Sequence, residues 1–260
     1  MRGFILHTGC SLGLLALFLF LGGCGSKTPP SNASEDPFVH YRLGDTHLKA
    51  GRLEQAIEEF EKSVALDPLN PVFYNYLGLA YFFDERYSAA IQVFNRALQL
   101  NPNFTDVHNN LGMVYSEMGD KERARAEFQQ VIRAKEYLTP EVAYYNLGKL
   151  SLTDKDYEEA AFFFQKALES NPNLHKAHER LAFTYELMGR LDEAEKEYQE
   201  ALKLERRMIE TNYNLAMLYF KQQKYSKSKY YFYEVVSLAP NTPWSAKAEE
   251  FLKLIEKREK

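Results

Sequence analysis

The sequence predicts an all-α fold, a solenoid of six helix-turn-helix repeats closed by a C-terminal capping helix. Four of the five steps between successive Leu-Gly or Leu-Ala anchors are 34 residues long, and one is 36; the anchors are Gly44, Gly78, Gly112, Gly148, Ala182 and Ala216. Within each half of a repeat, apolar residues recur every three or four positions, which indicates two amphipathic helices. Because such a unit cannot cover its own apolar face, neighbouring units must stack.

The first segment, residues 1–23, has the features of a bacterial lipoprotein signal peptide. Met1 and Arg2 precede the uncharged run SLGLLALFLFLGG, and the Leu-Gly-Gly-Cys at its end resembles a lipobox. An uncleaved membrane anchor is the alternative, but the run is near the short end of what spans a bilayer. We therefore predict acylation of Cys24, which would anchor the mature protein to a membrane without spanning it.

Residues 24–36 are predicted to form a flexible tether, because GSKTPPSNASEDP is rich in Ser, Pro and Asn and has no apolar period. In lipoproteins of enteric bacteria, an Asp directly after the acylated Cys favours the inner membrane. This chain has Gly25 at that place. We therefore expect the protein at the outer membrane, lipid-anchored and facing the periplasm.

The six repeats are predicted at residues 37–70, 71–104, 105–138, 141–174, 175–208 and 209–242. Twelve residues after each anchor stands a small residue, and four further on stands an aromatic one, so that the two helices can approach closely. Glycines are expected to end three of the first helices, at Gly51, Gly119 and Gly189. Prolines are expected to end or redirect the second helices, at Pro68, Pro102, Pro172 and Pro240.

The third repeat departs from this pattern. Glu136 stands where a proline is expected, and two extra residues precede the fourth repeat in the segment YLTPEVAYYNLG. We expect a lengthened second helix followed by a tight Tyr-Leu-Thr-Pro turn.

The last segment, residues 243–260, is predicted to be a helix that covers the sixth repeat. Its apolar residues share one side of a helix, and they are Trp244, Ala248, Phe251, Leu252 and Ile255. A membrane-bound amphipathic helix is the alternative, but the end of a solenoid needs a cover with a polar outer face.

Composition argues against nucleic-acid binding and against catalysis. The net charge is −4, with basic residues dispersed among acidic ones, and both cysteines lie in the first 24 residues. His175 and His178 stand three residues apart, but His178 occupies the same repeat position as His40 and His108, which indicates packing rather than metal binding. We find no phosphate loop, zinc signature or nucleophile elbow, and therefore predict a non-enzyme without cofactor or metal.

The order Leu-Gly, Tyr, Ala, Phe, Ala, Pro within each unit resembles the tetratricopeptide repeat family, most completely in residues 71–104. The resemblance implies a right-handed superhelix whose first helices line a concave, partner-binding surface. Carried onto this chain, the family's binding positions are Tyr41, Asn75, Leu79, Phe82, Phe83, Asn109, Met113, Tyr145, Lys149, Leu152, Phe183, Tyr213, Met217 and Phe220.

This inferred groove is apolar and aromatic, as binding surfaces often are. The alternative is that several aromatic residues pack between first helices and only stiffen the stack; for Phe82, Phe83 and Phe220 together, binding is favoured. Asn75 and Asn109 could hold the backbone of an extended peptide. Lys149 is the only basic residue in the set, so capture of a free C-terminal carboxylate is not expected.

The lipobox, the six units and the Tyr-x-x-Pro break together resemble the pilotin family of type IV pilus biogenesis lipoproteins (PilF, PilW and Tgl). That resemblance implies a scaffold that binds secretin subunits and promotes their localisation and assembly at the outer membrane. A periplasmic adaptor for proteases or peptidoglycan enzymes is the alternative. The oligomeric state stays open.

Overall fold

The computed structural model describes residues 36–134 and 139–258, and every regular element within these ranges is an α-helix. The predicted signal peptide, Cys24 and most of the tether lie outside the described residues. Within the described ranges, six helix pairs are followed by a thirteenth helix, which confirms the predicted all-α solenoid. The pairs are α1 (Pro37–Lys49) with α2 (Leu53–Leu66), α3 (Pro71–Phe83) with α4 (Tyr87–Leu100), α5 (Thr105–Glu117) with α6 (Lys121–Arg133), α7 (Glu141–Thr153) with α8 (Tyr157–Ser170), α9 (His175–Leu187) with α10 (Leu191–Leu204), and α11 (Ile209–Lys221) with α12 (Tyr225–Leu238); α13 is Pro243–Arg258.

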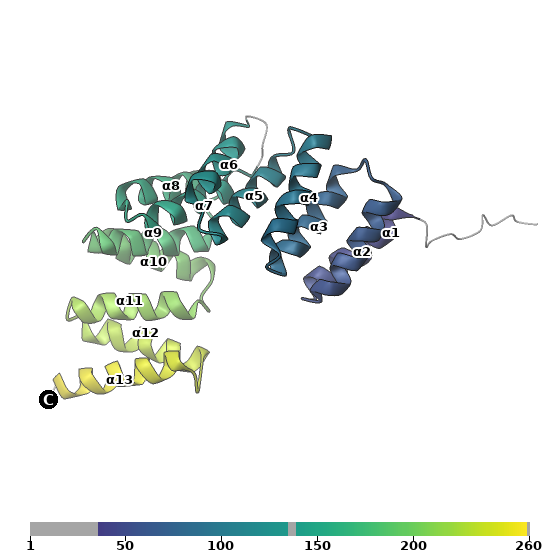
Figure 1. Cartoon of the computed structure of the whole chain (residues 1–260). Coiled ribbons are helices and arrows are strands. Elements are labelled where there is room, and N and C mark those ends of the chain that lie inside the picture. Colours follow the sequence, from purple (N-terminus) through teal and green to yellow (C-terminus); the bar gives the residue numbers. More distant parts are fainter. Residues whose placement is uncertain (1–35, 135–138, 259–260) are drawn as a thin grey trace, which may run out of the picture.

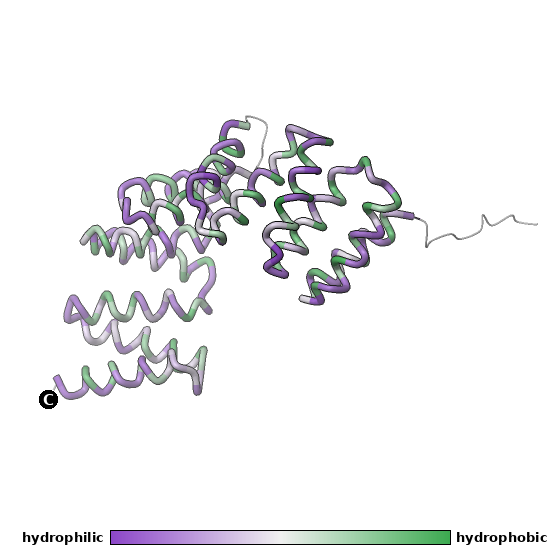
Figure 2. The backbone as a smooth tube through the Cα atoms, in the orientation of Figure 1, coloured by the Kyte–Doolittle hydropathy of each residue, from purple (hydrophilic) through white to green (hydrophobic). Residues whose placement is uncertain are grey.

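The pairs stack one after another along a curved path, with α1 and α13 at opposite ends (Figure 1). First helices of neighbouring pairs contact one another from α1 to α9 and again between α11 and α13, whereas direct contacts between neighbouring second helices are sparser. The first helices are therefore the inner layer of the curve, and the second helices are the outer one. Hydrophobic and hydrophilic residues are interspersed along most of the helices (Figure 2).

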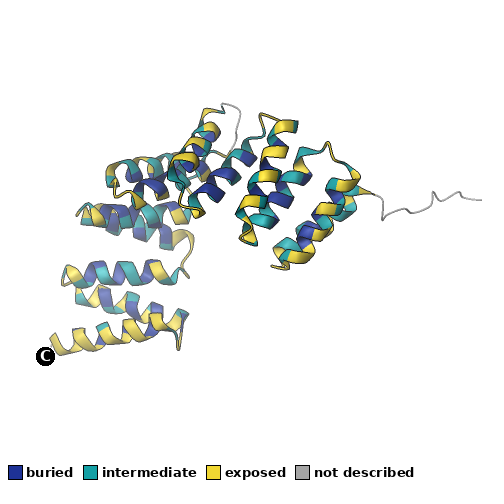
Figure 3. Cartoon of the chain, in the orientation of Figure 1, coloured by how far each residue is buried: buried dark blue, intermediate teal, exposed yellow. Residues whose placement is uncertain are grey.

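The core of each unit forms where its two helices cross. The aromatic ring of the second helix is fully or almost fully buried in all six units, at Phe60, Phe94, Phe128, Phe164, Tyr198 and Phe232. In the second unit, a Cβ atom on Gly78 would lie only 2.5 Å from Cε1 of Phe94, so the ring rests directly on the glycine backbone. The buried residues run through the middle of the stack, between the two layers (Figure 3).

The end of the third unit differs from what we expected. The prediction of a lengthened second helix is wrong. Helix α6 ends at Arg133 and has 13 residues, whereas the other second helices have 14. The backbone leaves the helical region at Ala134, where φ is −75° and ψ is 96°. The first two residues of the expected Tyr-Leu-Thr-Pro turn, Tyr137 and Leu138, lie outside the described residues. Pro140 has helical dihedral angles and directly precedes α7.

Helix α13 covers the end of the stack, as predicted. It contacts both α12 and α11, and it buries Ala248, Leu252 and Ile255. The ring of Phe251 stacks on the ring of Phe232 with a centroid distance of 5.4 Å and an interplanar angle of 6°. The face of α13 that points away from the stack is exposed (Figure 3). Among the described residues, we find no helix with the length and apolar character needed to cross a bilayer.

Candidate functional site

The inner layer of first helices is the candidate partner-binding surface. All fourteen groove residues predicted from the sequence lie on first helices, from Tyr41 on α1 to Phe220 on α11. Their surroundings differ from one end of the solenoid to the other.

An apolar area lies on α3 and α5. Phe83 is 53% exposed at the end of α3, and its ring contacts that of Phe82 at a centroid distance of 5.3 Å. Phe82 in turn contacts Tyr87 and packs, with Leu79 and Met113, against the buried core. We call Leu79, Phe82, Phe83 and Met113 the apolar patch. Its inner members are held by the core, whereas Phe83 offers its ring to solvent.

The two asparagines expected to hold a peptide backbone have different roles. Asn75 is 5% exposed, and its Oδ1 accepts a hydrogen bond from Nδ2 of Asn110 at 2.8 Å, which links α3 to α5. Asn109 donates its Nδ2 to the sulfur of Met113 at 3.8 Å, and its buried Oδ1 has no hydrogen-bond partner among the described residues. Asn75 therefore links two neighbouring first helices, whereas Asn109 has a hydrogen-bond acceptor beside the apolar patch.

Three predicted groove aromatics pack against rings of neighbouring helices and are partly exposed. Tyr41 packs on Phe73 and meets Tyr76 edge-on with a centroid distance of 4.8 Å. Tyr145 lies 5.8 Å from Phe164, and burial raises the pKa of both Tyr41 and Tyr145. The side chain of Tyr213 is enclosed by rings of α12 and α13. These residues stiffen the stack, which is the alternative weighed above.

Phe220 also packs against its neighbours. Its ring meets Phe251 of α13 at 5.1 Å and Tyr225 at 5.9 Å, and the guanidinium of Arg258 lies 5.1 Å from its centroid. The capping helix thus covers the residue that the sequence pattern grouped with Phe82 and Phe83. The other predicted positions differ in exposure: Leu152, Phe183 and Met217 are partly buried, and Lys149 is exposed.

A charged cluster on α9 and α11 was missed by sequence reasoning. Glu179 is only 7% exposed, and its Oε1 accepts a hydrogen bond from Thr211 at 2.8 Å. Burial alone would lower the pKa of Arg180, but the carboxylates of Glu179 and Glu210 raise it. The available signal was that Glu179 occupies the repeat position that holds Tyr145 and Tyr213 in neighbouring units.

A further acidic residue, Glu186, lies on the same inner layer. Glu186 accepts a hydrogen bond from Nζ of Lys221 at 2.6 Å, which ties α9 to α11. The inner surface is therefore apolar at α3 and α5 and charged at α9 and α11. Such a surface can bind a protein segment without covalent chemistry. Within residues 36–134 and 139–258, no cluster of His, Cys, Asp or Glu could hold a metal ion.

Comparison with known families supports this architecture. Models described as tetratricopeptide repeat match residues 41–103, 84–137, 151–207 and 209–242. These models describe a repeat scaffold, and none of them indicates a catalytic family. No curated protein sequence matches the chain significantly.

Three solved structures have similar folds. PilF of Pseudomonas aeruginosa aligns with a TM-score of 0.72 and 19% identity, over 84% of this chain and 99% of that one. PilW, described as a widely conserved type IV pilus biogenesis factor, aligns with a TM-score of 0.73 and 18% identity, over 81% and 97%. YrrB, described as having an unusual peptide-binding site, aligns with a TM-score of 0.57 and 19% identity, over 75% and 100%. At these identities the similarity concerns the fold.

Proposed function

The chain belongs to the tetratricopeptide repeat family, and on this premise we propose that it is an outer-membrane lipoprotein scaffold that binds secretin subunits during type IV pilus biogenesis. In this role it promotes their localisation to the outer membrane and their assembly into the pilus pore. The observation that carries the proposal is the similarity in fold to PilF and PilW over almost their whole length. The lipobox ending at Cys24 and the break before the fourth repeat agree with it.

The physical mechanism is capture of a partner segment by a preformed surface. The apolar patch combines an exposed ring, Phe83, with side chains braced by the core. Because the stacked helices already hold these groups in place, binding orders few side chains, and more of the contact energy becomes affinity. Acylation of Cys24 would keep this surface at the bilayer where secretin subunits insert.

A periplasmic adaptor for proteases or peptidoglycan enzymes is the second candidate. The similarity in fold to YrrB, a peptide-binding tetratricopeptide repeat protein, favours a general adaptor as well. The partner distinguishes the two functions, because both use the same kind of scaffold.

The test measures heat- and detergent-resistant secretin multimers in outer membranes of cells lacking the gene, with total secretin measured in parallel. We expect multimers to be lost while monomers persist. The wild-type gene should restore multimers, and Cys24→Ala should restore them poorly. Normal multimers in the deletion strain would overturn the secretin proposal and direct attention to the adaptor function.

A further inference from the structure

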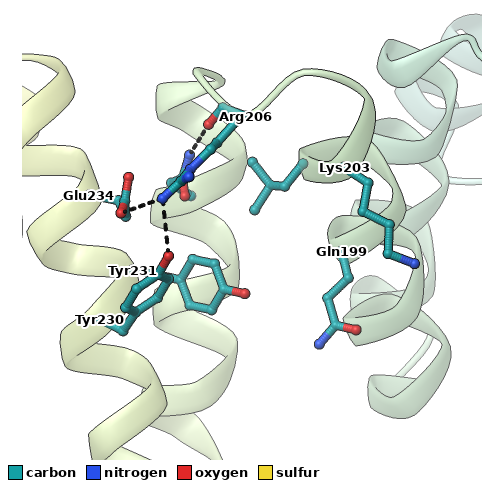
Figure 4. Close-up of a pocket in the computed structure, with 8 residues that line it drawn as sticks. Gln199, Lys203, Arg206, Tyr230, Tyr231 and Glu234 are labelled. Atoms are coloured by element: carbon teal, nitrogen blue, oxygen red, sulfur yellow. Dashed lines mark hydrogen bonds and ion pairs between the residues drawn. The ribbon is translucent and has the colours of Figure 1, made fainter.

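A cleft on the outer layer lies between α10 and α12, away from the apolar patch. It consists of two adjoining hollows of about 310 and 350 Å³ that share Gln199, Tyr230 and Tyr231 as lining residues. Figure 4 shows the first hollow, with Gln199 and Lys203 on the α10 side and the two tyrosines on α12. We call these two hollows the α10–α12 cleft.

The cleft has a rigid aromatic wall. Tyr231 stacks on Tyr219 with a centroid distance of 5.7 Å, and both Tyr231 and Leu202 pack against the buried core. Tyr230 meets Tyr231 edge-on at 4.9 Å and is 51% exposed. Tyrosines held in this way offer contact area to a ligand at low cost in conformational entropy.

The charged residues that line the cleft are mostly basic. Lys203, Arg206 and Lys227 face a single lining carboxylate, Glu234, which leaves a net charge of +2 in a chain with a net charge of −4. Each cation already has an acidic neighbour, since Lys203 pairs with Glu200, Lys227 with Glu195 and Arg206 with Glu234. The cations of these pairs are 55–73% exposed, and ion pairs of exposed cations contribute about 0–1 kcal/mol, so an acidic ligand can compete for them at little cost.

Arg206 shows how a departure from the repeat pattern shapes this cleft. It stands where other units have a proline, such as Pro172 and Pro240. Its guanidinium reaches from the α10–α11 connection to α12, where it donates to the hydroxyl of Tyr230 at 3.4 Å and to Glu234 at 3.2 Å (Figure 4). A proline could make neither contact. The substitution therefore places a cation at one end of the cleft, while Lys227 lies at the other end.

We propose that the α10–α12 cleft binds an acidic linear peptide segment of a protein partner. One aromatic or branched apolar side chain packs against Leu202, Tyr230 and Tyr231, and flanking carboxylates pair with Lys203 and Lys227. A concave hollow of this size fits a single side chain better than it fits a flat, anionic bilayer surface. The site is separate from the concave groove and does not depend on the partner proposed for that groove.

The test uses the full chain in a neutral detergent and the peptide acetyl-Gly-Ser-Glu-Phe-Glu-Ser-Gly-amide carrying a fluorophore. Fluorescence anisotropy gives the affinity, and a version with benzoylphenylalanine in place of Phe allows photo-crosslinking and mapping by mass spectrometry. We expect crosslinks in α10 and α12. A peptide with Lys in place of both Glu residues should bind at least about tenfold more weakly, because the lining charge is positive.

Two pairs of matched variants localise the site. Lys203→Glu with Lys227→Glu should weaken binding at least about tenfold, whereas Lys196→Glu with Lys253→Glu, an equal charge change at exposed positions outside the cleft, should change it less than about twofold. Tyr230→Ala should weaken binding about fivefold or more, and Tyr233→Ala, on the same helix but outside the cleft, should not.

Circular dichroism separates loss of binding from loss of fold. If the charge-reversed protein unfolds, the neutral variant Lys203→Gln with Lys227→Gln should still weaken binding. Three outcomes would each overturn the proposal. One is crosslinks that map to first helices, and another is equal affinity for the acidic and basic peptides. The third is displacement of the peptide by glycerol 3-phosphate at the same concentration as the peptide.

Discussion

At the scale of single residues, the turns inside the repeats alternate between two ways of ending a first helix. Three turns have a glycine in the left-handed region, at Gly51, Gly119 and Gly189, with φ between 70° and 79°. The equivalent turns of the other three units hold Glu85, Lys155 and Gln223 at φ near 60°. A side chain makes this backbone conformation unfavourable, because Cβ comes close to the carbonyl oxygen. The glycine rule thus describes half of the units, and the other half tolerate local strain.

Replacing Glu85 by glycine should stabilise the protein. Glycine removes the left-handed strain but adds freedom to the unfolded chain, so we expect a net gain of about 0.5–1 kcal/mol in the free energy of unfolding. Urea denaturation followed by circular dichroism measures it. Gly119→Ala is the reciprocal control, because its new Cβ would meet nothing within 4 Å and only the backbone is affected. It should destabilise, and a gain in stability there would contradict the argument.

Phe83→Ala should weaken binding of the partner by roughly tenfold or more while leaving the fold intact, because exposed aromatic anchors dominate binding surfaces. Phe162→Ala is the matched control, since Phe162 is 51% exposed but lies on a second helix, α8. Affinity for purified periplasmic secretin segments provides the measurement, and melting temperature reports folding. Equal losses of affinity in both variants would count against the concave surface.

At the scale of elements, the two helices of a pair are joined by different contacts in odd and even units. In the first, third and fifth units, a histidine of the first helix pairs with a glutamate 19 residues later at 2.6–2.7 Å: His40 with Glu59, His108 with Glu127, and His178 with Glu197. In the fourth unit the same spacing joins the rings of Tyr144 and Phe163. The sequence showed that these histidines recur, but their acceptors became visible only in the folded pair.

The pair of His178 and Glu197 should make stability depend on pH. Burial by itself would lower the pKa of His178, but its hydrogen bonds to Glu197 and to the Pro172 carbonyl raise that pKa above its ordinary value. A raised histidine pKa means that the stabilisation is complete below the ordinary pKa of His and is lost as the pH rises through the folded value. We therefore expect the melting temperature to fall between pH 5.5 and pH 8.

The variant Glu197→Gln separates this pair from other titrating groups. It should cost up to about 2 kcal/mol at pH 5.5, where the hydrogen bond is charge-assisted, and less at pH 8. Thermal melts of both proteins at both pH values provide the comparison. An equal cost at the two pH values would show that the charge on His178 contributes nothing.

Elements were predictable to different degrees. The repeating apolar period and the small residues determined the helix pairs, because the contacts that define a pair lie within one repeat. The end of α6 was not predictable in the same way. Its expected extra length was inferred from a missing proline, but the absence of a proline only permits further helical residues and does not require them, and α6 ends at Arg133.

At the scale of the whole molecule, the curved stack depends on its last helix. Without α13, the buried side chains of Phe232 and Val235 on α12 would lose their cover. Stability in a solenoid is approximately a sum over units and their interfaces, so the terminal interface matters for the whole array.

Ile255→Ala should therefore destabilise the protein by about 2–4 kcal/mol, because Ile255 is fully buried. Leu254→Ala, at a neighbouring position that is 39% exposed, should cost less than about 1 kcal/mol. Chemical denaturation of both variants gives the comparison. If the two costs are equal, α13 does not pack on the solenoid as described.

That the first helices form the inner layer was implied by the resemblance to the tetratricopeptide repeat family. The all-α class, the six helix pairs and the capping helix were predictable from the residues themselves. These features follow from local periodicity and from contacts between segments that are adjacent in the sequence, so a single sequence is enough to predict them. Which inner side chains remain available depends on tertiary packing, which leaves Phe83 exposed, joins Asn75 to Asn110 and packs α13 against Phe220. It also formed the α10–α12 cleft from Lys203, Arg206 and Tyr230. The physical reason is that exposure depends on neighbours about 25 to 35 residues away in sequence, whose packing geometry no repeat pattern specifies.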